Sequence, residues 1–251
     1  MLTLKKGNNM DKIITAENIR SFAYVNDAVC LLPIKGVALS FFGLGNMTMY
    51  DGDTAEGVSL GKSGILYVVP YTNPWAWMNA QTVALVDEIL DVLFDKFSLP
   101  NNTPIVSSGE SMGGQSALTY CAYAKRTPVA CVANCPVCDA LYHYSERADL
   151  PRTMYSSLHN FDGTLECALK SISPIHLAER LPKIRYYIFH CDADRAVNIS
   201  VHSDLFVKKM REVGHSVDYT VVKGRDHCDI GKENRILFEK LIADSVLSAR
   251  K

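Results

Sequence analysis

A serine flanked by small residues is the first feature of this 251-residue chain with an obvious chemical use. Residues 109–114 read GESMGG and match G-x-S-x-G, with Ser111 at the centre. An apolar run precedes this motif and a segment with helical periodicity follows it. Small residues two positions before and two after a serine permit a sharp strand-to-helix turn that exposes the hydroxyl. We therefore expect Ser111 to be a nucleophile; a glycine-rich turn without catalytic meaning is the alternative.

A serine hydroxyl is a poor nucleophile unless a base accepts its proton and an acid orients that base. The segment GRDHCD, which directly follows an apolar run, contains His227. The segment HCDADRAV follows another such run and contains Asp192 and Asp194. Because the carboxyl ends of parallel strands meet at one edge of a sheet, Ser111, one of these aspartates and His227 can converge there.

The elements that must position these residues alternate along the chain. Short runs rich in β-branched and aromatic residues are separated by segments with helical periodicity. Nearly continuous apolar runs are typical of parallel strands covered on both faces, and this alternation predicts a parallel sheet between helical layers. Residues 21–26 could add an antiparallel edge strand. We expect strands at 36–42, 64–70, 104–108, 129–134, 184–190 and 217–222, and helices at 79–97, 112–125, 200–213 and 233–249.

One segment does not follow the alternation. Residues 136–182 contain scattered aromatic residues, no strong helical period and an SISP turn. We interpret this segment as a small cap-like insertion over one end of the sheet. No repeat or linker rich in proline and glycine divides the chain, and about 250 residues suit one α/β domain. We therefore expect a single domain over residues 1–251.

The composition excludes several classes of protein. There are 26 Lys and Arg against 27 Asp and Glu, which gives a net charge of −1. Such a balance provides no long-range attraction to nucleic acid or to anionic lipid, so neither partner is expected. No window approaches the roughly 20 apolar residues of a membrane span, and the N-terminus lacks the apolar stretch of a signal peptide. We expect a cytoplasmic protein whose eight cysteines are mostly buried thiols.

The C-terminal third resembles the α/β-hydrolase superfamily, closest to its single-domain esterases and its dienelactone-hydrolase and prolyl-oligopeptidase-like branches. HCDADRAVNISVHSDLFVKKMREVGHSVDYTVVKGRDH is similar to the family pattern H-G-x-x-D-x-x-V, then helix, strand and G-x-x-H. That pattern places the acid four residues after the first histidine, which implies Asp194 rather than Asp192. The resemblance, from about residue 36 onward, implies a three-layer α/β/α sandwich with a mostly parallel sheet. It also makes His190 a structural residue behind the acid.

Two positions depart from the family pattern. Cys191 stands where the family usually has glycine, and FFGLGN stands where many relatives have H-G-x-G, so Phe42 replaces the histidine. The glycines on both sides of Leu44 still match. The resemblance then implies an oxyanion hole made by the backbone N–H groups of Met112 and Leu44, and a backbone donor does not depend on side-chain identity.

Other residues that could bind a metal have simpler explanations. The spacing of Cys131, Cys135 and Cys138 equals that of a three-cysteine iron–sulfur motif, but it begins inside a predicted strand. No compact fourth ligand for zinc follows it. We therefore expect neither a metal nor a cofactor. His202 and His215 flank a predicted surface helix, so we expect both in solvent.

Two loops could form walls of a substrate site. The loop YTNPWAWMN places Trp75 and Trp77 at the same sheet edge as Ser111. One tryptophan is expected to anchor the following helix, while an exposed one would suit a sugar ring or an aromatic acyl group. The acidic segment at residues 51–56, DGDTAE, is expected to be a solvated loop.

These observations predict a serine hydrolase that cleaves a carboxylic ester through an acyl-enzyme. The nucleophile would be Ser111, the base His227 and the acid Asp194, and the substrate an acylated carbohydrate or an aromatic ester. A small serine peptidase of prolyl-oligopeptidase type uses the same machinery and is one alternative. A catalytically silent hydrolase-like binding protein is the other. The oligomeric state stays open.

Overall fold

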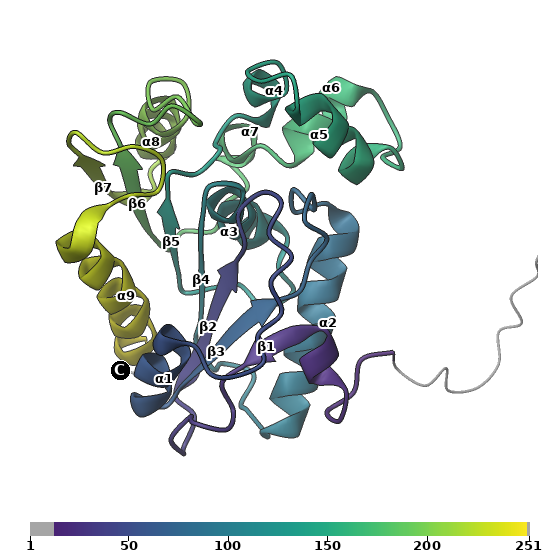
Figure 1. The fold of residues 1–251 in the computed structure, drawn as a ribbon, viewed down its shortest axis with the longest axis vertical. Coiled ribbons are helices and arrows are strands. Elements are labelled where there is room, and N and C mark those ends of the chain that lie inside the picture. Colours follow the sequence, from purple (N-terminus) through teal and green to yellow (C-terminus); the bar gives the residue numbers. More distant parts are fainter. Residues whose placement is uncertain (1–12, 250–251) are drawn as a thin grey trace, which may run out of the picture.

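A seven-stranded sheet forms the centre of the computed structural model, which describes residues 13–249 (Figure 1). Its strands are β1 (Ala23–Val25), β2 (Gly36–Phe41), β3 (Ile65–Pro70), β4 (Ile105–Glu110), β5 (Ala130–Asn134), β6 (Arg185–Cys191) and β7 (Ser216–Val222). They pair in the order β1-β3-β2-β4-β5-β6-β7. Only β1 within this sheet runs antiparallel, against β3. The predicted α/β fold and its antiparallel edge strand are thus confirmed.

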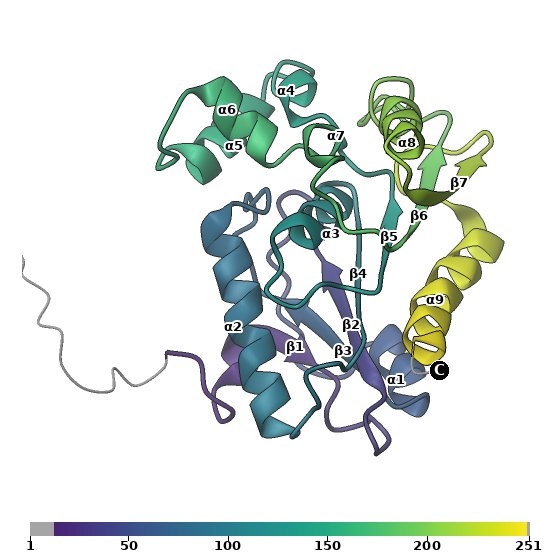
Figure 2. The ribbon, with the colours of Figure 1, turned by 180° about the vertical axis from the view of Figure 1, so that it is seen from behind.

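Helices cover both faces of this sheet (Figures 1 and 2). The buried apolar residues of α2 (Ala80–Lys96) and α8 (Ser203–Glu212), and those of α3 (Met112–Tyr123) except Met112, belong to one core cluster. Those of α1 (Ala55–Lys62) and α9 (Gly231–Ser248) belong to a second. Within β2, Val37 and Leu39 join the first cluster while Ala38 joins the second, so successive side chains are buried on opposite faces. That is why the predicted strands read as continuous apolar runs.

Two expectations about local structure need correction or extension. The segment 51–56 is not all loop, because α1 begins at Ala55, where the Thr54 side chain accepts a hydrogen bond from the Gly57 N–H at 2.9 Å. The insertion holds four short helices, and in both views α4, α5 and α6 lie beyond the carboxyl ends of the strands (Figures 1 and 2). These helices are α4 (Ala140–His143), α5 (Leu150–Leu158), α6 (Leu165–Ser171) and α7 (Pro174–Leu177), and a short 3-10 helix, η1 (Ile19–Ser21), precedes β1.

No helix within residues 13–249 is long and apolar enough to cross a membrane.

The turn from β4 into α3 has room for no side chain at two of its glycines. A Cβ atom on Gly109 would lie 2.3 Å from the Gly113 carbonyl oxygen. A Cβ on Gly113 would lie 2.0 Å from the carbonyl oxygen of Phe41 at the end of β2. Both distances are far inside van der Waals contact, so the turn closes only because these positions lack side chains. The close approach of α3 to β2 holds Ser111, between the two glycines, in place.

We expect Gly113→Ala to destabilise the protein by about 2 kcal/mol, because a methyl group would push α3 away from backbone atoms of β2. Urea unfolding followed by circular dichroism measures the change. Gly52→Ala is the matched control, since a Cβ at Gly52 would meet no atom within 4 Å. That control should change the free energy of unfolding by less than about 0.5 kcal/mol. Equal stability of the two variants would contradict the steric explanation.

Candidate active site

Ser111 occupies the strained point of the turn. Its backbone has φ 58° and ψ −125°, a left-handed conformation that is uncommon for any residue with a side chain. The Ser111 N–H donates to the Asn134 carbonyl at 2.9 Å, and helix α3 starts at the next residue. Strain of this kind persists only where the surrounding structure imposes it, as the two glycines do here. The hydroxyl is thereby carried at the amino terminus of α3, where partial positive charge favours a developing anion.

The loops after β6 and β7 bring a histidine and an aspartate together. The Nδ1 atom of His227 lies 2.6 Å from Oδ2 of Asp194. Asp192, the other acidic candidate, points elsewhere: it accepts a hydrogen bond from the Gly224 N–H at 2.6 Å and pairs with Lys223 at 3.3 Å. The geometry therefore selects Asp194 as the acid that can orient His227.

The Asp194 side chain is fully buried, and several hydrogen-bond donors surround it. Its Oδ1 atom accepts the N–H groups of Ala196 and Val197, each at 2.8 Å. His190 Nε2 lies 3.4 Å from Oδ2 on the other side. Burial alone would raise the pKa of this carboxyl, but hydrogen bonds from His190, His227 and Val197 hold it well below its usual range. Asp194 is therefore a carboxylate that orients without taking up a proton.

His190 has the structural role expected of it. Its Nε2 also lies 3.1 Å from the Val197 carbonyl, an acceptor only, so this nitrogen carries the proton. Its Nδ1 then accepts the hydroxyl of Ser203 at 2.6 Å. These bonds fasten the acid-bearing loop to the first turn of α8.

The pKa of His227 is raised to about 9. Burial opposes the charged imidazolium, but hydrogen bonds and charge interactions with Asp194 and with the sulfur of Cys135 outweigh that penalty. The Asp194 bond at Nδ1 also sets the tautomer of the neutral ring, which leaves the Nε2 lone pair free to accept a proton.

The loop of Ser111 is tied to the loop of His227 through their chain neighbours. Asn134 Nδ2 donates to Glu110 at 3.3 Å and to the Cys228 carbonyl at 3.2 Å. Arg235 also pairs with Glu110 and donates to the Cys228 carbonyl. Within the part of the chain that the structure describes, the Ser111 hydroxyl and His227 form no hydrogen bond. Such bonds often tighten only when substrate is present.

Cys135 is a residue of this site that sequence reasoning missed. It directly follows β5, is fully buried, and its Sγ accepts the N–H groups of Cys191 and Cys228 at 3.4 Å each. In the sequence, Cys135 is conspicuous only through its spacing to Cys131 and Cys138. The rule applied to Asp194 and His227, that residues after parallel strands share one edge, would have placed it here.

Two histidines are buried, contrary to expectation. His202 is fully buried and His215 is 6% exposed. The Nδ1 atom of His202 accepts the N–H groups of Cys138 and Asp139, so its proton is on Nε2, which donates to Glu146 at 3.1 Å. His215 Nε2 lies 2.8 Å from the carbonyl of Ala178. Both histidines are buried because the insertion packs over the ends of α8, and the helical pattern of the sequence does not indicate that contact.

Glu146 also joins His143 at 2.6 Å, which makes a His–Glu–His cluster with donor atoms within 4.8 Å of one another. The cluster has the ligand types of a zinc site. However, His202 would need a lone pair on Nε2, and its Nδ1 lone pair is already used by two N–H groups. The cluster is therefore better suited to hydrogen bonding than to metal binding. Through the Asn198 N–H, 3.3 Å from Glu146, it joins the insertion to the acid-bearing loop.

The expected oxyanion donors are the backbone N–H groups of Met112 and Leu44. Met112 begins α3 and is buried. Gly43, in the loop after β2, approaches Ser111, since a Cβ there would lie 3.8 Å from Cβ of Ser111. Leu44 follows Gly43 and packs partly against the core cluster beneath the insertion.

The two tryptophans differ in their surroundings. Trp77 is fully buried and its Nε1 donates to the Thr153 hydroxyl at 3.1 Å, so it anchors the insertion. This burial does not fit the expectation that Trp77 contacts a substrate. Trp75 is half-buried, with the Arg152 guanidinium 5.4 Å from its ring centroid.

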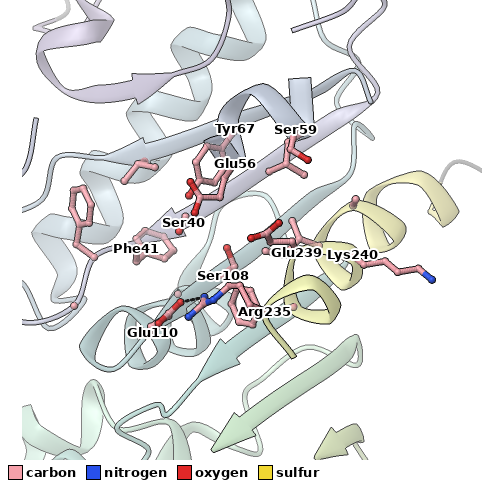
Figure 3. Close-up of a pocket in the computed structure, with 18 of the residues that line it drawn as sticks. Ser40, Phe41, Glu56, Ser59, Tyr67, Ser108, Glu110, Arg235, Glu239 and Lys240 are labelled. Atoms are coloured by element: carbon pink, nitrogen blue, oxygen red, sulfur yellow. Dashed lines mark hydrogen bonds and ion pairs between the residues drawn. The ribbon is translucent and has the colours of Figure 1, made fainter. Parts of the chain in front are cut away.

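A cavity of about 660 Å³ includes Ser111 and Gly43 in its lining. Figure 3 shows this cavity between α1 and α9, with Glu56 on the α1 side, Glu239 on the α9 side, and Tyr67 and Ser40 near Glu56. Burial and the charge of Glu56 raise the pKa of Glu239, while Arg235 opposes this. The charged side chains that line the cavity are Glu56, Glu110, Glu239, Arg235 and Lys240, so both signs of charge are present.

Known proteins with the same fold include both peptidases and esterases. An acylaminoacyl peptidase from Pyrococcus horikoshii matches with a TM-score of 0.66 and 13% identity, over 86% of this chain and 37% of that one. An S-formylglutathione hydrolase from Agrobacterium tumefaciens matches with a TM-score of 0.64 and 17% identity, over 90% and 87% of the two chains. A truncated carbohydrate esterase from gut microbiota matches with a TM-score of 0.65 and 15% identity, over 85% and 86%. At such identities the likeness shows the fold.

The chain spans about a third of the length of several matching peptidases, among them a dipeptidyl peptidase 4 from Porphyromonas gingivalis at 33%. No curated protein matches the chain in sequence. The sequence model of the prolyl oligopeptidase family matches residues 85–243, which is more than half of the chain. With the strained serine turn and the Asp194–His227 pair inside that match, this chain, an α/β-hydrolase by fold, belongs to the prolyl oligopeptidase family.

Proposed function

We propose that the chain is a serine hydrolase that cleaves carboxylic esters with Ser111, His227 and Asp194. The observation that carries the proposal is the 2.6 Å bond between His227 Nδ1 and the buried Asp194 carboxylate, at the same sheet edge as a serine in a strained strand-to-helix turn. A base oriented in this way and a serine lifted from the sheet are the parts that acyl transfer requires.

In the proposed reaction, Ser111 Oγ attacks the carbonyl carbon while His227 Nε2 takes its proton. The negative charge on the carbonyl oxygen is stabilised by the backbone N–H groups of Met112 and Leu44. His227 then gives its proton to the departing alkoxide, which leaves an acyl group on Ser111. Water, activated by the same histidine, attacks this ester, and the acid is released. Asp194 holds the ring and stabilises its charged form throughout.

Two features favour an ester over a peptide. The carbohydrate esterase and the S-formylglutathione hydrolase match this chain over most of their own length, whereas the acylaminoacyl peptidase matches over 37% of its length. The cavity beside Ser111 is lined by side chains of both charges and by the hydroxyl groups of Ser40, Ser59 and Tyr67, which suit a polar group such as part of a sugar. Family membership favours the second candidate, a serine peptidase. For the ester-cleaving hydrolase we also propose a small-molecule substrate and a cytoplasmic location.

Ser111→Ala should reduce turnover of p-nitrophenyl acetate and of acetylated or feruloylated sugars by about 10⁴-fold or more, because the acyl-enzyme cannot form. Initial rates of purified proteins measure this. Ser116→Ala, on the same helix α3, is the control and should stay within about threefold of wild type. Aminoacyl amides in the same panel test the peptidase alternative: faster turnover of amides than of every ester would replace the ester assignment. A fluorophosphonate that labels neither wild type nor variant would indicate a silent binding protein.

Asp194→Asn should lower kcat by about 10⁴-fold, because the amide cannot stabilise the imidazolium and favours the wrong tautomer of His227. Asp192→Asn makes the same chemical change two residues away and should alter kcat by less than about threefold, since Asp192 is bound to Gly224 and Lys223. Steady-state kinetics on one ester compare them. The opposite order would move the acid to Asp192.

The pH dependence of kcat/KM should follow His227. A base must be neutral to accept a proton. With all cysteines kept as thiols by a reducing agent, kcat/KM should therefore rise with pH and reach half its maximum near the His227 pKa of about 9. Because this pKa lies above the ordinary value of 6.5, the associated stabilisation of the fold is full below about pH 6.5 and is lost as pH rises through about 9. Rates from pH 6 to pH 10.5, corrected with Ser111→Ala for spontaneous hydrolysis, measure the first effect. A midpoint below about pH 7 would contradict the assigned environment of His227.

A further inference from the structure

Two thiols converge on the proposed base. The Sγ atoms of Cys135 and Cys228 and a ring nitrogen of His227 all lie within 4.8 Å of one another. Cys135 follows β5, whereas His227 and Cys228 follow β7, so two loops that are far apart in sequence bring the thiols together. Both cysteines have left-handed backbones, with φ of 44° at Cys135 and 62° at Cys228. Neither is in a disulfide.

The surroundings of Cys135 favour its thiolate. Two backbone N–H groups, from Cys191 and Cys228, point at its Sγ. The Cys228 thiol lowers the pKa of Cys135, and His227 adds to this effect, although burial acts against both. The same contact raises the pKa of Cys228. Cys135 is therefore the sulfur that loses its proton more readily, and Cys228, which is half-buried, is the more accessible of the two.

We propose that Cys135 and Cys228 form an oxidisable thiol pair that closes to a disulfide next to His227 and thereby frees His227 to act as a base at lower pH. The effect on catalysis depends on the function proposed above, in which His227 is the base; the disulfide itself does not. The oxidant is a hydroperoxide, of which hydrogen peroxide is small enough to enter a half-buried site.

The chemistry balances in two steps. Cys228, having passed its proton to Cys135, attacks one peroxide oxygen; the O–O bond breaks, and the hydroxide released takes that proton from Cys135 to form water. Cys228 is then a sulfenic acid. The Cys135 thiolate attacks the Cys228 sulfur, the S–O bond breaks, and the second hydroxide takes a proton from the His227 imidazolium. One peroxide becomes two waters, two thiols become a disulfide by losing two electrons, and His227 is left neutral.

The consequence follows from what surrounds His227. Asp194 and Cys135 are the two groups whose negative charge keeps the imidazole protonated, and a disulfide has no such charge. Asp194 remains, so His227 keeps its orientation and part of its elevated pKa. The other ionisable groups facing this edge are the Glu110–Arg235 pair from β4 and α9, His190 from β6, Cys191 after it, and the Arg195–Asp226 pair beside the base.

Peptide mapping tests the disulfide without any substrate. Wild-type protein is treated with hydrogen peroxide in the presence of a chelator, and free thiols are then blocked before digestion. Trypsin places Cys228 alone in the peptide 226–232, and Cys135 with two other cysteines in the peptide 127–147. Fragmentation of the linked pair should assign the bond to Cys135. A bond from Cys228 to Cys131, Cys138 or Cys191, or no bond at all, would overturn the proposal.

A titration of His227 tests the consequence, again without turnover. In protein with ¹³C-labelled histidine, the His227 signal is assigned with His227→Gln, and its midpoint is followed by NMR. We expect the midpoint to fall by about one pH unit or more on oxidation, and by a similar amount in reduced Cys135→Ala. Cys228→Ala keeps the Cys135 thiol but cannot close the disulfide, so peroxide should not move its midpoint. Cys167→Ala, which removes an exposed cysteine, is the control and should respond as wild type does.

The acid limb of the kcat/KM profile should move by the same amount as the NMR midpoint. If the disulfide forms and the midpoint falls but no ester is turned over, the proposed function has failed and the thiol pair stands. If the disulfide forms and the midpoint does not move, in wild type and in Cys135→Ala alike, the link between the thiols and the base is falsified. Reduction with dithiothreitol should restore the original midpoint.

Discussion

The buried carboxylate of Asp194 constrains the end of the sheet that carries Ser111 and His227. Removing a carboxylate from water costs several kcal/mol, and the charge persists only if hydrogen-bond donors replace the lost water. Asp194 meets that condition with two backbone N–H groups, His190 and His227. These donors come from its own loop, from the end of β6 and from the loop after β7. The end of the sheet must therefore stay assembled around Asp194, and the position of His227 follows from it.

The predictable part of this architecture is the part set by local rules. Continuous apolar runs identified six strands because each is covered on both faces, as the alternation of Val37, Ala38 and Leu39 between two core clusters illustrates. The serine turn was predictable because two positions within five residues must be glycine. A side chain at Gly109 would collide with Gly113, and one at Gly113 would collide with the neighbouring strand β2. The pairing of Asp194 with His227 was expected from the rule that parallel strands end at one edge, together with a family resemblance.

What the sequence did not indicate depends on contacts between distant segments. His202 directly precedes the amphipathic helix α8 and was expected in solvent, yet the insertion folds over it and supplies two backbone N–H groups and Glu146. Trp77 looks like a possible binding residue, but Thr153 of α5 accepts its indole N–H inside a core cluster. A helical period or a strand pattern describes one element at a time. Neither pattern reveals which distant segment will pack over that element and bury its side chains.

Asp194 and Cys135 both raise the pKa of His227, but their surroundings differ. Asp194 shares its charge among four donors, so its own affinity for a proton is low and it serves to orient His227. Cys135 accepts two N–H···S hydrogen bonds at 3.4 Å. These bonds are weak, because sulfur is a poorer hydrogen-bond acceptor than a carboxylate oxygen. The negative charge of Cys135 can be withdrawn by oxidation, whereas that of Asp194 cannot. Asp194 thus sets the orientation of His227 and part of its basicity, whereas Cys135 contributes to its basicity, so a change at Cys135 need not disturb the orientation.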